Sequence, residues 1–573
     1  MTRGLQKGLT NYGDADFSLF LRKAFIKAMG YSDDALDRPI IGVTNTASDY
    51  NPCHGNLPDL LESVKRGVML SGGLPMVFPT ISIHESFAHP TSMFLRNLMA
   101  MDTEEMVRAQ PMDAVVVIGG CDKTLPAQVM AIASSDLPSI VVPTGPMAVG
   151  NYKGEVLGAC TDCRRLWAQH RAGTIDKAEI DLISGRLVPT VGTCGVMGTA
   201  STMACIIEAL GLALPMSATA PATHADRRRI AEASGKRAAE MALSGSPKPS
   251  DLITHTSVRN AMIVLQAIGG STNGLIHLIA MAGRAGVKLD MDAFDRLGRE
   301  IPVLLNLKPS GTHYMEDFHH AGGLPALMRE LTSFLDMEAL SVAGGTIGDS
   351  IAGAQFVPGQ DVIRSVAAPL KKSGAMAVLH GNLAPHSALI KQSAASPELM
   401  RHTGRAVVFD SIEDMAARID LPDLDVNAED VLVLRNAGPK GAPGMPEAGY
   451  LPIPLKLARL GVKDMVRISD ARMSGTAFGT IVLHVSPEAA IGGPLAVVQT
   501  GDRIMLDVAA RQIELLIDAT EMQRRLAAWK ELPPQREAAT RGYAKLFEDH
   551  VLQADQGCDF DFLLSKGNTG SDS

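Results

Sequence analysis

The stretch Asp113-Ala-Val-Val-Val-Ile-Gly-Gly-Cys-Asp-Lys-Thr124 decides the fold class. Five apolar residues follow Asp113 without polar alternation, which is typical of a strand buried on both faces of a parallel sheet. A helical pattern begins at Leu125, so Cys121, Asp122 and Lys123 should lie in the loop at the carboxyl end of this strand. Ligands of open α/β sheets bind at that edge. We therefore expect an α/β fold with functional side chains in this loop.

Length and composition limit the possible classes of protein. A chain of 573 residues is too long for one hydrophobic core, so at least two domains are expected. A net charge of -9 and an isoelectric point near 5.9 argue against a surface for nucleic acid or anionic membrane. No apolar run is long enough for a membrane span, and the first residues do not resemble a signal peptide. Seven cysteines, an odd number in a long chain, do not suggest a secreted disulfide framework and fit a reducing cytoplasm.

Two more cysteines share the sequence context of Cys121. Cys53 and Cys194 each follow an apolar stretch that predicts a strand and precede a helical pattern. The predicted strands are 40–45 and 187–193, and the predicted helices are 56–70 and 200–210. Parallel strands joined by right-handed crossovers place their exit loops along one edge of the sheet, so the three thiols could meet there. The residues alone leave open whether these thiols are metal ligands or inert buried groups.

Several loop residues carry hard oxygen donors. Glu85, Asp122 and Glu447 are suited to Mg²⁺, although a single loop carboxylate is more often a solvated charge or a helix cap. Lys123 would be costly as an ammonium group beside a metal centre, so we expect it to be neutral or modified. Ser474, within Arg472-Met-Ser-Gly-Thr476, reads by default as a turn or cap residue.

The second half of the chain has a different sequence pattern. Period-two alternation at 502–508 and 511–517, with frequent glycine-proline turns, predicts a β-rich domain. We expect residues 1–374 to form the α/β domain, preceded by a polar, irregular arm over 1–38. Residues 375–573 should form the second domain, with a disordered polar tail from about 565.

Other patterns in the chain are weaker. Cys160-Thr-Asp-Cys163 could be a redox pair or half of a zinc site, but no second pair lies nearby to complete it, so a structural role is favoured. His84 and His89 are five residues apart rather than four, which excludes the helix of the zinc proteases. No glycine-rich dinucleotide fingerprint follows a predicted strand.

Six short motifs, in order along the chain, resemble the family of dihydroxy-acid and sugar-acid dehydratases. They are Asn51-Pro-Cys-His-Gly-Asn56, Gly120-Cys-Asp-Lys-Thr124, Gly192-Thr-Cys-Gly195, Gly269-Gly-Ser-Thr-Asn273, Gly438-Pro-Lys-Gly-Ala-Pro-Gly-Met-Pro-Glu447 and Asp470-Ala-Arg-Met-Ser-Gly475. The resemblance covers most of the chain. It implies a hydro-lyase that converts a 2,3-dihydroxy acid into a 2-keto-3-deoxy acid, with a β-barrel-like C-terminal domain that closes over the cluster domain.

The resemblance also implies cofactors and residue roles. It implies a [2Fe-2S] cluster and Mg²⁺, a small-molecule sugar-acid substrate, and a homodimer or homotetramer. The cluster would be held by Cys53, Cys121 and Cys194. The Mg²⁺ ion would be held by Glu85, Asp122, Glu447 and a carbamylated Lys123. Ser474 would be the catalytic base, and Thr476 would lie near the substrate carboxylate. A cluster held by three thiolates leaves one iron open to act as a Lewis acid.

Within the family the sequence resembles the pentonate branch. Phe78-Pro-Thr-Ile-Ser-Ile-His-Glu85 and Asn436-Ala-Gly-Pro-Lys-Gly441 favour a sugar acid such as L-arabinonate or D-xylonate. The alternative, a dihydroxy-acid dehydratase of branched-chain amino-acid synthesis, typically has aspartate where Glu85 stands. His84 replaces the small residue expected there. A more distant alternative is a non-catalytic thiol protein that senses redox state or binds zinc through Cys160 and Cys163.

Overall fold

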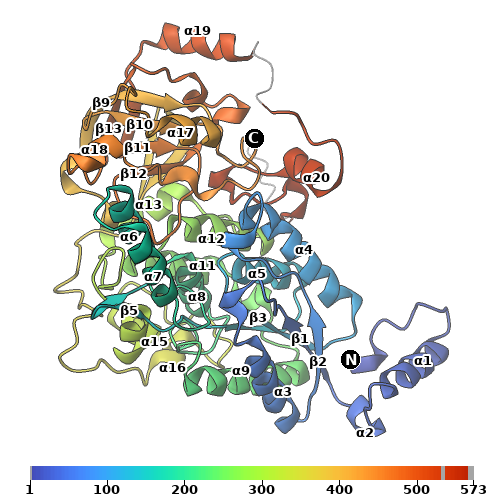
Figure 1. The fold of residues 1–573 in the computed structure, drawn as a ribbon. Coiled ribbons are helices and arrows are strands. Elements are labelled where there is room, and N and C mark those ends of the chain that lie inside the picture. Colours follow the sequence, from blue (N-terminus) through green and yellow to red (C-terminus); the bar gives the residue numbers. More distant parts are fainter. Residues whose placement is uncertain (1–2, 531–535, 566–573) are drawn as a thin grey trace.

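A four-stranded parallel sheet organises the N-terminal part of the protein. The computed structural model describes residues 3–530 and 536–565 (Figure 1). The strand order is β2-β1-β3-β4. The strands are β1 (Ile40–Asn45), β2 (Leu74–Pro79), β3 (Ala114–Gly119) and β4 (Ser139–Pro143). The five apolar residues of β3 are completely buried, as the apolar run predicts.

Helices cover both faces of this sheet. Helices α3 (Leu57–Leu70) and α9 (Ala225–Ser244) pack on one face, and α4 (Ser92–Ala109) and α5 (Thr124–Ser135) pack on the other (Figure 1). Helices α3 and α9 approach each other closely because glycines lie where they are in contact. A Cβ atom on Gly67 would lie 2.0 Å from the carbonyl oxygen of Glu232, so any side chain there would force the helices apart.

Further helices complete the N-terminal part. Three of them pack against α5 or one another: α8 (Thr199–Ala209), α11 (His255–Ala267) and α12 (Thr272–Arg284). The others are α1 (Ala15–Lys27), α2 (Asp33–Leu36), α10 (Pro249–Leu252), α13 (Met291–Glu300), α14 (Met315–His320), α15 (Gly323–Glu330) and α16 (Ile347–Ile351). Within the described residues, no helix has the length and apolar character needed to cross a membrane.

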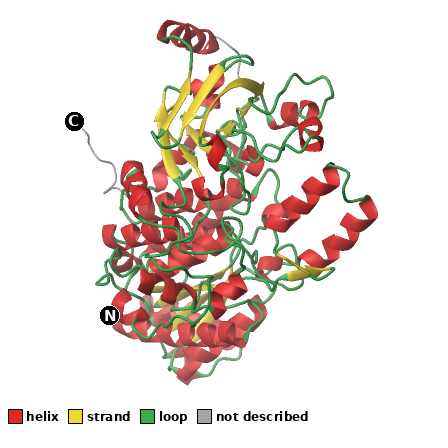
Figure 2. Cartoon of the chain, turned by 90° about the vertical axis from the view of Figure 1, so that its left-hand side faces the viewer, coloured by secondary structure: helices red, strands yellow, loops and turns green. Residues whose placement is uncertain are grey.

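A protruding unit interrupts the chain between β4 and Cys194. It contains a hairpin and two helices that stand out from the body of the molecule (Figure 2). Its elements are β5 (Gly150–Tyr152), β6 (Glu155–Leu157), α6 (Thr161–Arg171) and α7 (Lys177–Leu187). We call residues 150–187 the excursion. Arg171 of the excursion pairs with Asp420 at 2.7 Å, which ties it to the C-terminal part.

The C-terminal part is a closed barrel of eight strands in the order β10-β11-β12-β8-β7-β14-β13-β9. The strands are β7 (Ala377–Gly381), β8 (Ala384–Ile390), β9 (Arg401–Phe409), β10 (Val431–Leu434), β11 (Arg467–Ser469), β12 (Ile481–Ser486), β13 (Arg503–Asp507) and β14 (Gln512–Leu515). The helices are α17 (Ile412–Arg418), α18 (Leu455–Arg459), α19 (Ala519–Lys530) and α20 (Gly542–His550). The predicted fold class, an α/β domain followed by a β-barrel-like domain, is confirmed.

The end of the chain returns to the N-terminal part. Tyr543 and Phe547 of α20 pack on Phe94 of α4, with ring centroids 5.0 and 4.8 Å apart. The completely buried side chain of Arg96 donates hydrogen bonds to the carbonyl oxygens of Gly557, at 2.8 Å, and Cys558, at 2.9 Å. The last described segment is therefore part of the packing of α4.

Two local predictions differ from the structure. The strand predicted over 187–193 is wrong: α7 ends at Leu187, and Thr193 makes only an isolated bridge to Pro146. Pro189 has no amide hydrogen to donate to a strand ladder. The arm over 1–38 is not irregular, because it contains α1 and α2, whose N-caps Asp14 and Ser32 accept hydrogen bonds from the first turns. Most of the predicted disordered tail, residues 566–573, lies outside the described residues.

Candidate active site

Three loops bring thiols to the carboxyl edge of the sheet. Cys53 lies in a single 3₁₀ turn after β1, and Cys121 lies two residues after β3; both are buried. The sulfur atoms of Cys53 and Cys121 and a ring nitrogen of His84 all lie within 4.8 Å of one another. Cys194 reaches the same edge by a different route from the one predicted, through the hydrogen bond from Thr193 N to the carbonyl oxygen of Gly145 at 2.9 Å.

A buried histidine fixes the loop that carries Cys121. The Nε2 atom of His54 accepts hydrogen bonds from the backbone N–H groups of Gly120, at 2.9 Å, and Cys121, at 3.2 Å. Its Nδ1 atom lies 2.8 Å from the carbonyl oxygen of Thr46, which requires a proton on Nδ1. Burial lowers the pKa of His54 to about 4, so the ring stays neutral and keeps this tautomer. The sequence analysis gave His54 no role.

The thiol pair of Cys53 and Cys121 favours one thiolate. A hydrogen bond with the Cys121 thiol lowers the pKa of Cys53 to about 6, against the opposing effect of burial. Burial acts to lower the pKa of His84, but the neighbouring Cys53 and the charge of Asp122 outweigh it, and the net shift is upward. His84 is therefore more readily protonated beside the thiols, at a position where the family resemblance leads us to expect a small residue.

A fourth thiol lies against Cys194. The sulfur of Cys160, at the start of α6, is 3.7 Å from the sulfur of Cys194. All seven cysteines of the chain are free. The sequence analysis favoured a purely structural role for Cys160, and this contact was not expected from the pattern of cysteines.

Carboxylates gather beside the thiols. The ammonium group of Lys123 is completely buried, forms an ion pair with Asp122, and lies 3.5 Å from Glu85 Oε2. Thr91, at the N-cap position of α4, donates its hydroxyl to Glu85 at 2.7 Å instead of capping the helix. The structure therefore brings Glu85, Asp122 and Lys123 together from two separate loops.

Arg472 links this group to the barrel. Its guanidinium donates to Glu85 Oε1 at 3.0 Å and to Glu447 Oε1 at 2.6 Å, and its side chain is almost completely buried. Burial alone would raise the pKa of Glu85, but the charges of Arg472 and Lys123 outweigh it and hold that pKa well below its usual range. For Glu447, burial is the stronger effect and raises the pKa. Arg472 is a site residue that the sequence analysis quoted within a motif but did not assign.

Ser474 and Thr476 lie in the same loop as Arg472. Their hydroxyl oxygens are 2.8 Å apart, and Thr161 of the excursion donates its hydroxyl to the carbonyl oxygen of Thr476 at 3.1 Å. Beneath the loop, the buried ammonium of Lys391 donates to the carbonyl oxygen of Gly475 at 3.3 Å. Both domains and the excursion thus contribute to one site.

The donor atoms of the site form two adjoining sets. Cys53, Cys121, Cys160 and Cys194 are soft sulfur donors suited to an iron–sulfur cluster or zinc. Glu85, Asp122 and Glu447 are hard oxygen donors suited to Mg²⁺. Buried carboxylates need a cation, and here Arg472 and Lys123 supply that charge. The residues present therefore fit both a cluster and a divalent cation.

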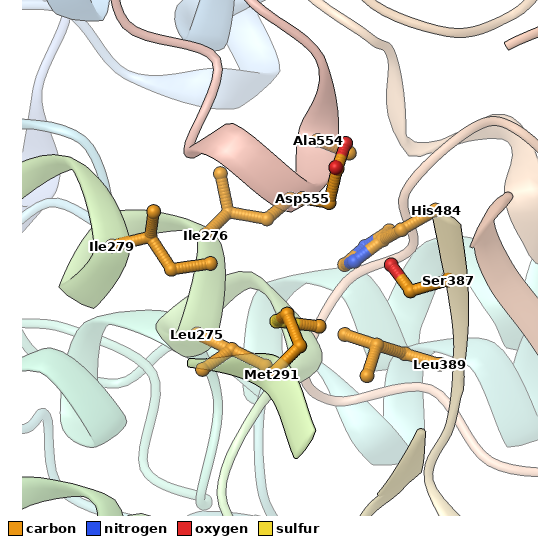
Figure 3. A pocket seen from close by; sticks show the side chains of 9 residues that line it. All are labelled: Leu275, Ile276, Ile279, Met291, Ser387, Leu389, His484, Ala554 and Asp555. Carbon is orange, nitrogen blue, oxygen red and sulfur yellow. The ribbon is translucent and has the colours of Figure 1, made fainter. Parts of the chain in front are cut away.

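A small pocket lies elsewhere, between α12 and the barrel. Figure 3 shows its lining, which includes Ile276, Met291, Leu389 and His484. Burial lowers the pKa of His484 to about 3, so its ring is neutral. None of the predicted site residues lines this pocket. The predicted chemistry therefore depends on the thiols, the carboxylates and the Ser474 loop rather than on this cavity.

Comparison with known proteins agrees with this geometry. Residues 38–350 match the N-terminal domain of the dihydroxy-acid/6-phosphogluconate dehydratases, and residues 361–558 match their C-terminal domain. The chain is an enzyme of the hydro-lyase class. It belongs to the dihydroxy-acid/6-phosphogluconate dehydratase family, as the sequence motifs predicted.

Individual relatives cover nearly the whole chain. An L-arabinonate dehydratase of Rhizobium leguminosarum bv. trifolii is 46% identical over 567 residues, 98% of this chain and 97% of its own. A 6-deoxy-6-sulfo-D-gluconate dehydratase of Pseudomonas putida is 46% identical over 534 residues, 93% of this chain and 91% of its own. A dihydroxy-acid dehydratase of Moorella thermoacetica is 39% identical over 543 residues, 93% of this chain and 97% of its own.

Proposed function

We propose that the protein dehydrates a sugar acid, an aldonate such as L-arabinonate or D-xylonate, to its 2-keto-3-deoxy acid. The observation that carries this proposal is the convergence of Cys53, Cys121 and Cys194 with the carboxylates of Glu85, Asp122 and Glu447. The thiols would hold a [2Fe-2S] cluster. The carboxylates, with a carbamylated Lys123, would hold Mg²⁺. When bound, the cluster supplies a Lewis acid for the leaving 3-hydroxyl, and Mg²⁺ supplies one for the carboxylate and 2-hydroxyl.

The chain's own residues divide the remaining work. Ser474 Oγ is the proposed base that removes the C2 proton. A serine hydroxyl is a weak base in water, so it needs a cationic environment, to which the guanidinium of Arg472 contributes in the adjoining group. Thr476, 2.8 Å from Ser474 Oγ, holds that hydroxyl and lies near the proposed position of the substrate carboxylate. The barrel and the excursion limit the access of water to the site.

The alternative substrate class is a branched dihydroxy acid. Relatives named dihydroxy-acid dehydratase are 39% identical, whereas relatives named for sugar-acid substrates are 46% identical. The family resemblance gives the dihydroxy-acid branch an aspartate where this chain has Glu85. Both differences support a sugar acid.

Other aspects of the protein are proposed on separate grounds. A division of the chain at 374/375 is supported by the start of β7 at Ala377. Assembly as a homodimer or homotetramer is supported by α1, whose side chains Phe17, Phe20 and Phe25 are 47–74% exposed. A cytoplasmic location is supported by the seven free thiols.

An anaerobic activity screen tests the proposed function. The purified protein would be loaded with iron, sulfide and Mg²⁺ and offered L-arabinonate, D-xylonate, 6-deoxy-6-sulfo-D-gluconate and 2,3-dihydroxyisovalerate. We expect a 2-keto acid product from at least one of the pentonates. Turnover of 2,3-dihydroxyisovalerate alone would contradict the sugar-acid proposal.

A further inference from the structure

Cys160 stands out because the mechanism proposed above does not use it. It directly precedes α6, and the excursion carries it out of the N-terminal part and back to the thiols. Its sulfur lies 3.7 Å from that of Cys194, and its residue is only partly accessible to solvent. A purely structural cysteine does not need to lie against a thiol of a metal site.

The distance between these two sulfurs can be compared with the distances in a disulfide bond and between two ligands of one metal ion. A disulfide bond would bring them to about 2.05 Å. Two thiolates on one tetrahedral metal, with metal–sulfur bonds of about 2.3 Å, lie about 3.8 Å apart. The 3.7 Å between the free thiols of Cys160 and Cys194 matches this spacing, so both sulfurs could bind one metal ion without a large movement.

The other two thiols form a second pair. The sulfurs of Cys53 and Cys121 lie within 4.8 Å of each other, on two different exit loops. A [2Fe-2S] cluster normally takes four thiolates, two on each iron. The site thus offers two pairs of sulfurs, Cys53 with Cys121 and Cys160 with Cys194, which is the number of thiolates that a fully ligated cluster takes.

The residues that follow Cys160 contact the other parts of the proposed site. Its neighbour Thr161 donates a hydrogen bond to the carbonyl oxygen of Thr476, two residues from Ser474. Arg164, one turn further along α6, reaches to 4.0 Å from Glu447. The N-terminal turn of α6 therefore spans the thiols, the base and the carboxylates.

We propose that Cys160 is the fourth thiolate ligand of the cluster in the substrate-free enzyme, where it caps the iron that would otherwise be open. This inference rests on the proposed dehydratase function. On substrate binding, the 3-hydroxyl would replace Cys160 on that iron. The hydroxyl would keep its proton, as it must to leave as hydroxide, and the released sulfur would leave as a thiolate with its electron pair, so no electron is transferred. In the resting enzyme the thiolate shields the cluster from oxygen.

Paired cysteine variants test this inference. Cys160→Ser and its matched control Cys163→Ser would be loaded anaerobically with iron and sulfide beside the unaltered protein. All three should bind about two irons per chain. Without substrate, only Cys160→Ser should change the electron paramagnetic resonance spectrum of the reduced cluster. Only that variant should also lose its visible absorption several times faster in air.

Identical substrate-free spectra and bleaching rates for Cys160→Ser and the unaltered protein would overturn the inference. If Cys160→Ser does not fold, the unaltered protein still decides: adding L-arabinonate or D-xylonate, whichever it turns over, should shift its spectrum as the thiolate is displaced, and an unchanged spectrum would overturn the proposal. Failure of the proposed function gives a different result, because the unaltered protein would then bind zinc or no metal in place of iron and sulfide.

Discussion

The ammonium group of Lys391 donates a hydrogen bond to the backbone carbonyl oxygen of Gly475, at 3.3 Å, from the end of strand β8. Lys391 is buried, and burial lowers its pKa to about 7. Gly475 joins the proposed base Ser474 to Thr476, and a Cβ atom on it would lie 2.6 Å from Ser271. A buried cation thus fixes a loop that has no room for a side chain.

This contact predicts how stability depends on pH. Lys391 has a pKa near 7 in the folded protein and about 10.5 when unfolded, so between these values the unfolded chain binds more protons. Stability should therefore rise with pH across this range. At pH 7, Lys391→Met should be more stable than the unaltered protein, because it no longer buries a group that prefers to be charged. The gain should be on the order of a few kcal/mol, and the lost hydrogen bond to Gly475 should reduce it. The difference should shrink toward pH 10.

Thermal unfolding at pH 7 and pH 9 would measure this effect. The exposed Lys371→Met serves as the matched control and should show no pH-dependent difference from the unaltered protein. An equal change in Tm at both pH values for Lys391→Met would contradict the assigned burial cost. Activity should fall in Lys391→Met even where stability rises, because the loop of Ser474 loses an anchor.

Removal of the proposed base gives a second prediction. Ser474→Ala should lower kcat by about 10²–10⁴-fold, the usual contribution of a positioned base, while leaving the visible spectrum of the cluster intact. Ser310→Ala is a suitable control, since Ser310 pairs with Ser393 at 2.9 Å rather than with Thr476. Loss of the cluster spectrum in Ser474→Ala would indicate a structural role instead.

A third prediction concerns the guanidinium between two carboxylates. Arg472→Met removes the cation that contacts both Glu85 and Glu447, so the metal-free protein should lose about 3–5 kcal/mol of stability. Mg²⁺ should restore part of this, because it binds the folded state at the same carboxylates. The rise in Tm on adding Mg²⁺ should therefore be larger in the variant than in the unaltered protein.

The matched control for this experiment is Arg284→Met. Arg284 is equally buried and pairs with Asp559 at 2.5 Å, away from the proposed metal site. Its variant should be destabilised without any added response to Mg²⁺. A similar rise in Tm for both variants would mean that Mg²⁺ acts nonspecifically.

A fourth prediction separates the two donor sets. Chelation by EDTA should abolish activity without bleaching the protein, since Glu85, Asp122 and Glu447 are oxygen donors and the cluster ligands are sulfurs. Added Mg²⁺ should restore turnover. Glu447→Gln should raise the Mg²⁺ concentration for half-maximal activity by about tenfold or more, because one anionic ligand is lost. An unchanged Mg²⁺ requirement would remove Glu447 from the proposed ligand set.

Local sequence patterns correctly predicted the elements that are defined by the spacing of their own apolar residues. The apolar run of β3 and the helical spacing of α3 required no information from distant segments. Because Cys53 and Cys121 follow such strands, their placement at one edge was predictable. The predicted strand before Cys194 was wrong because residues 190–192 form bends, and Thr193 bonds to Gly145 in the loop after β4 rather than to the sheet.

The roles of residues that act through long-range contacts could not be predicted from local sequence patterns. Arg472 bridges carboxylates that are hundreds of residues apart, and His54 is identified only by the amides of Gly120 and Cys121. Lys391 looks like an ordinary lysine at the end of an apolar strand. The only sequence signal for Arg472 and His54 was their membership in motifs of the family, and Lys391 had no such signal.

The return of the chain end to α4 has a consequence for synthesis. Arg96 takes two of its hydrogen-bond acceptors from Gly557 and Cys558, and Phe94 packs on rings of α20. Domains generally fold as they leave the ribosome, the N-terminal one first. Here α4 precedes the barrel in the chain but lacks these partners until residues 543–558 have been translated, so the surface around α4 stays open while the barrel is made. A helix of the first domain is therefore among the last elements to be completed.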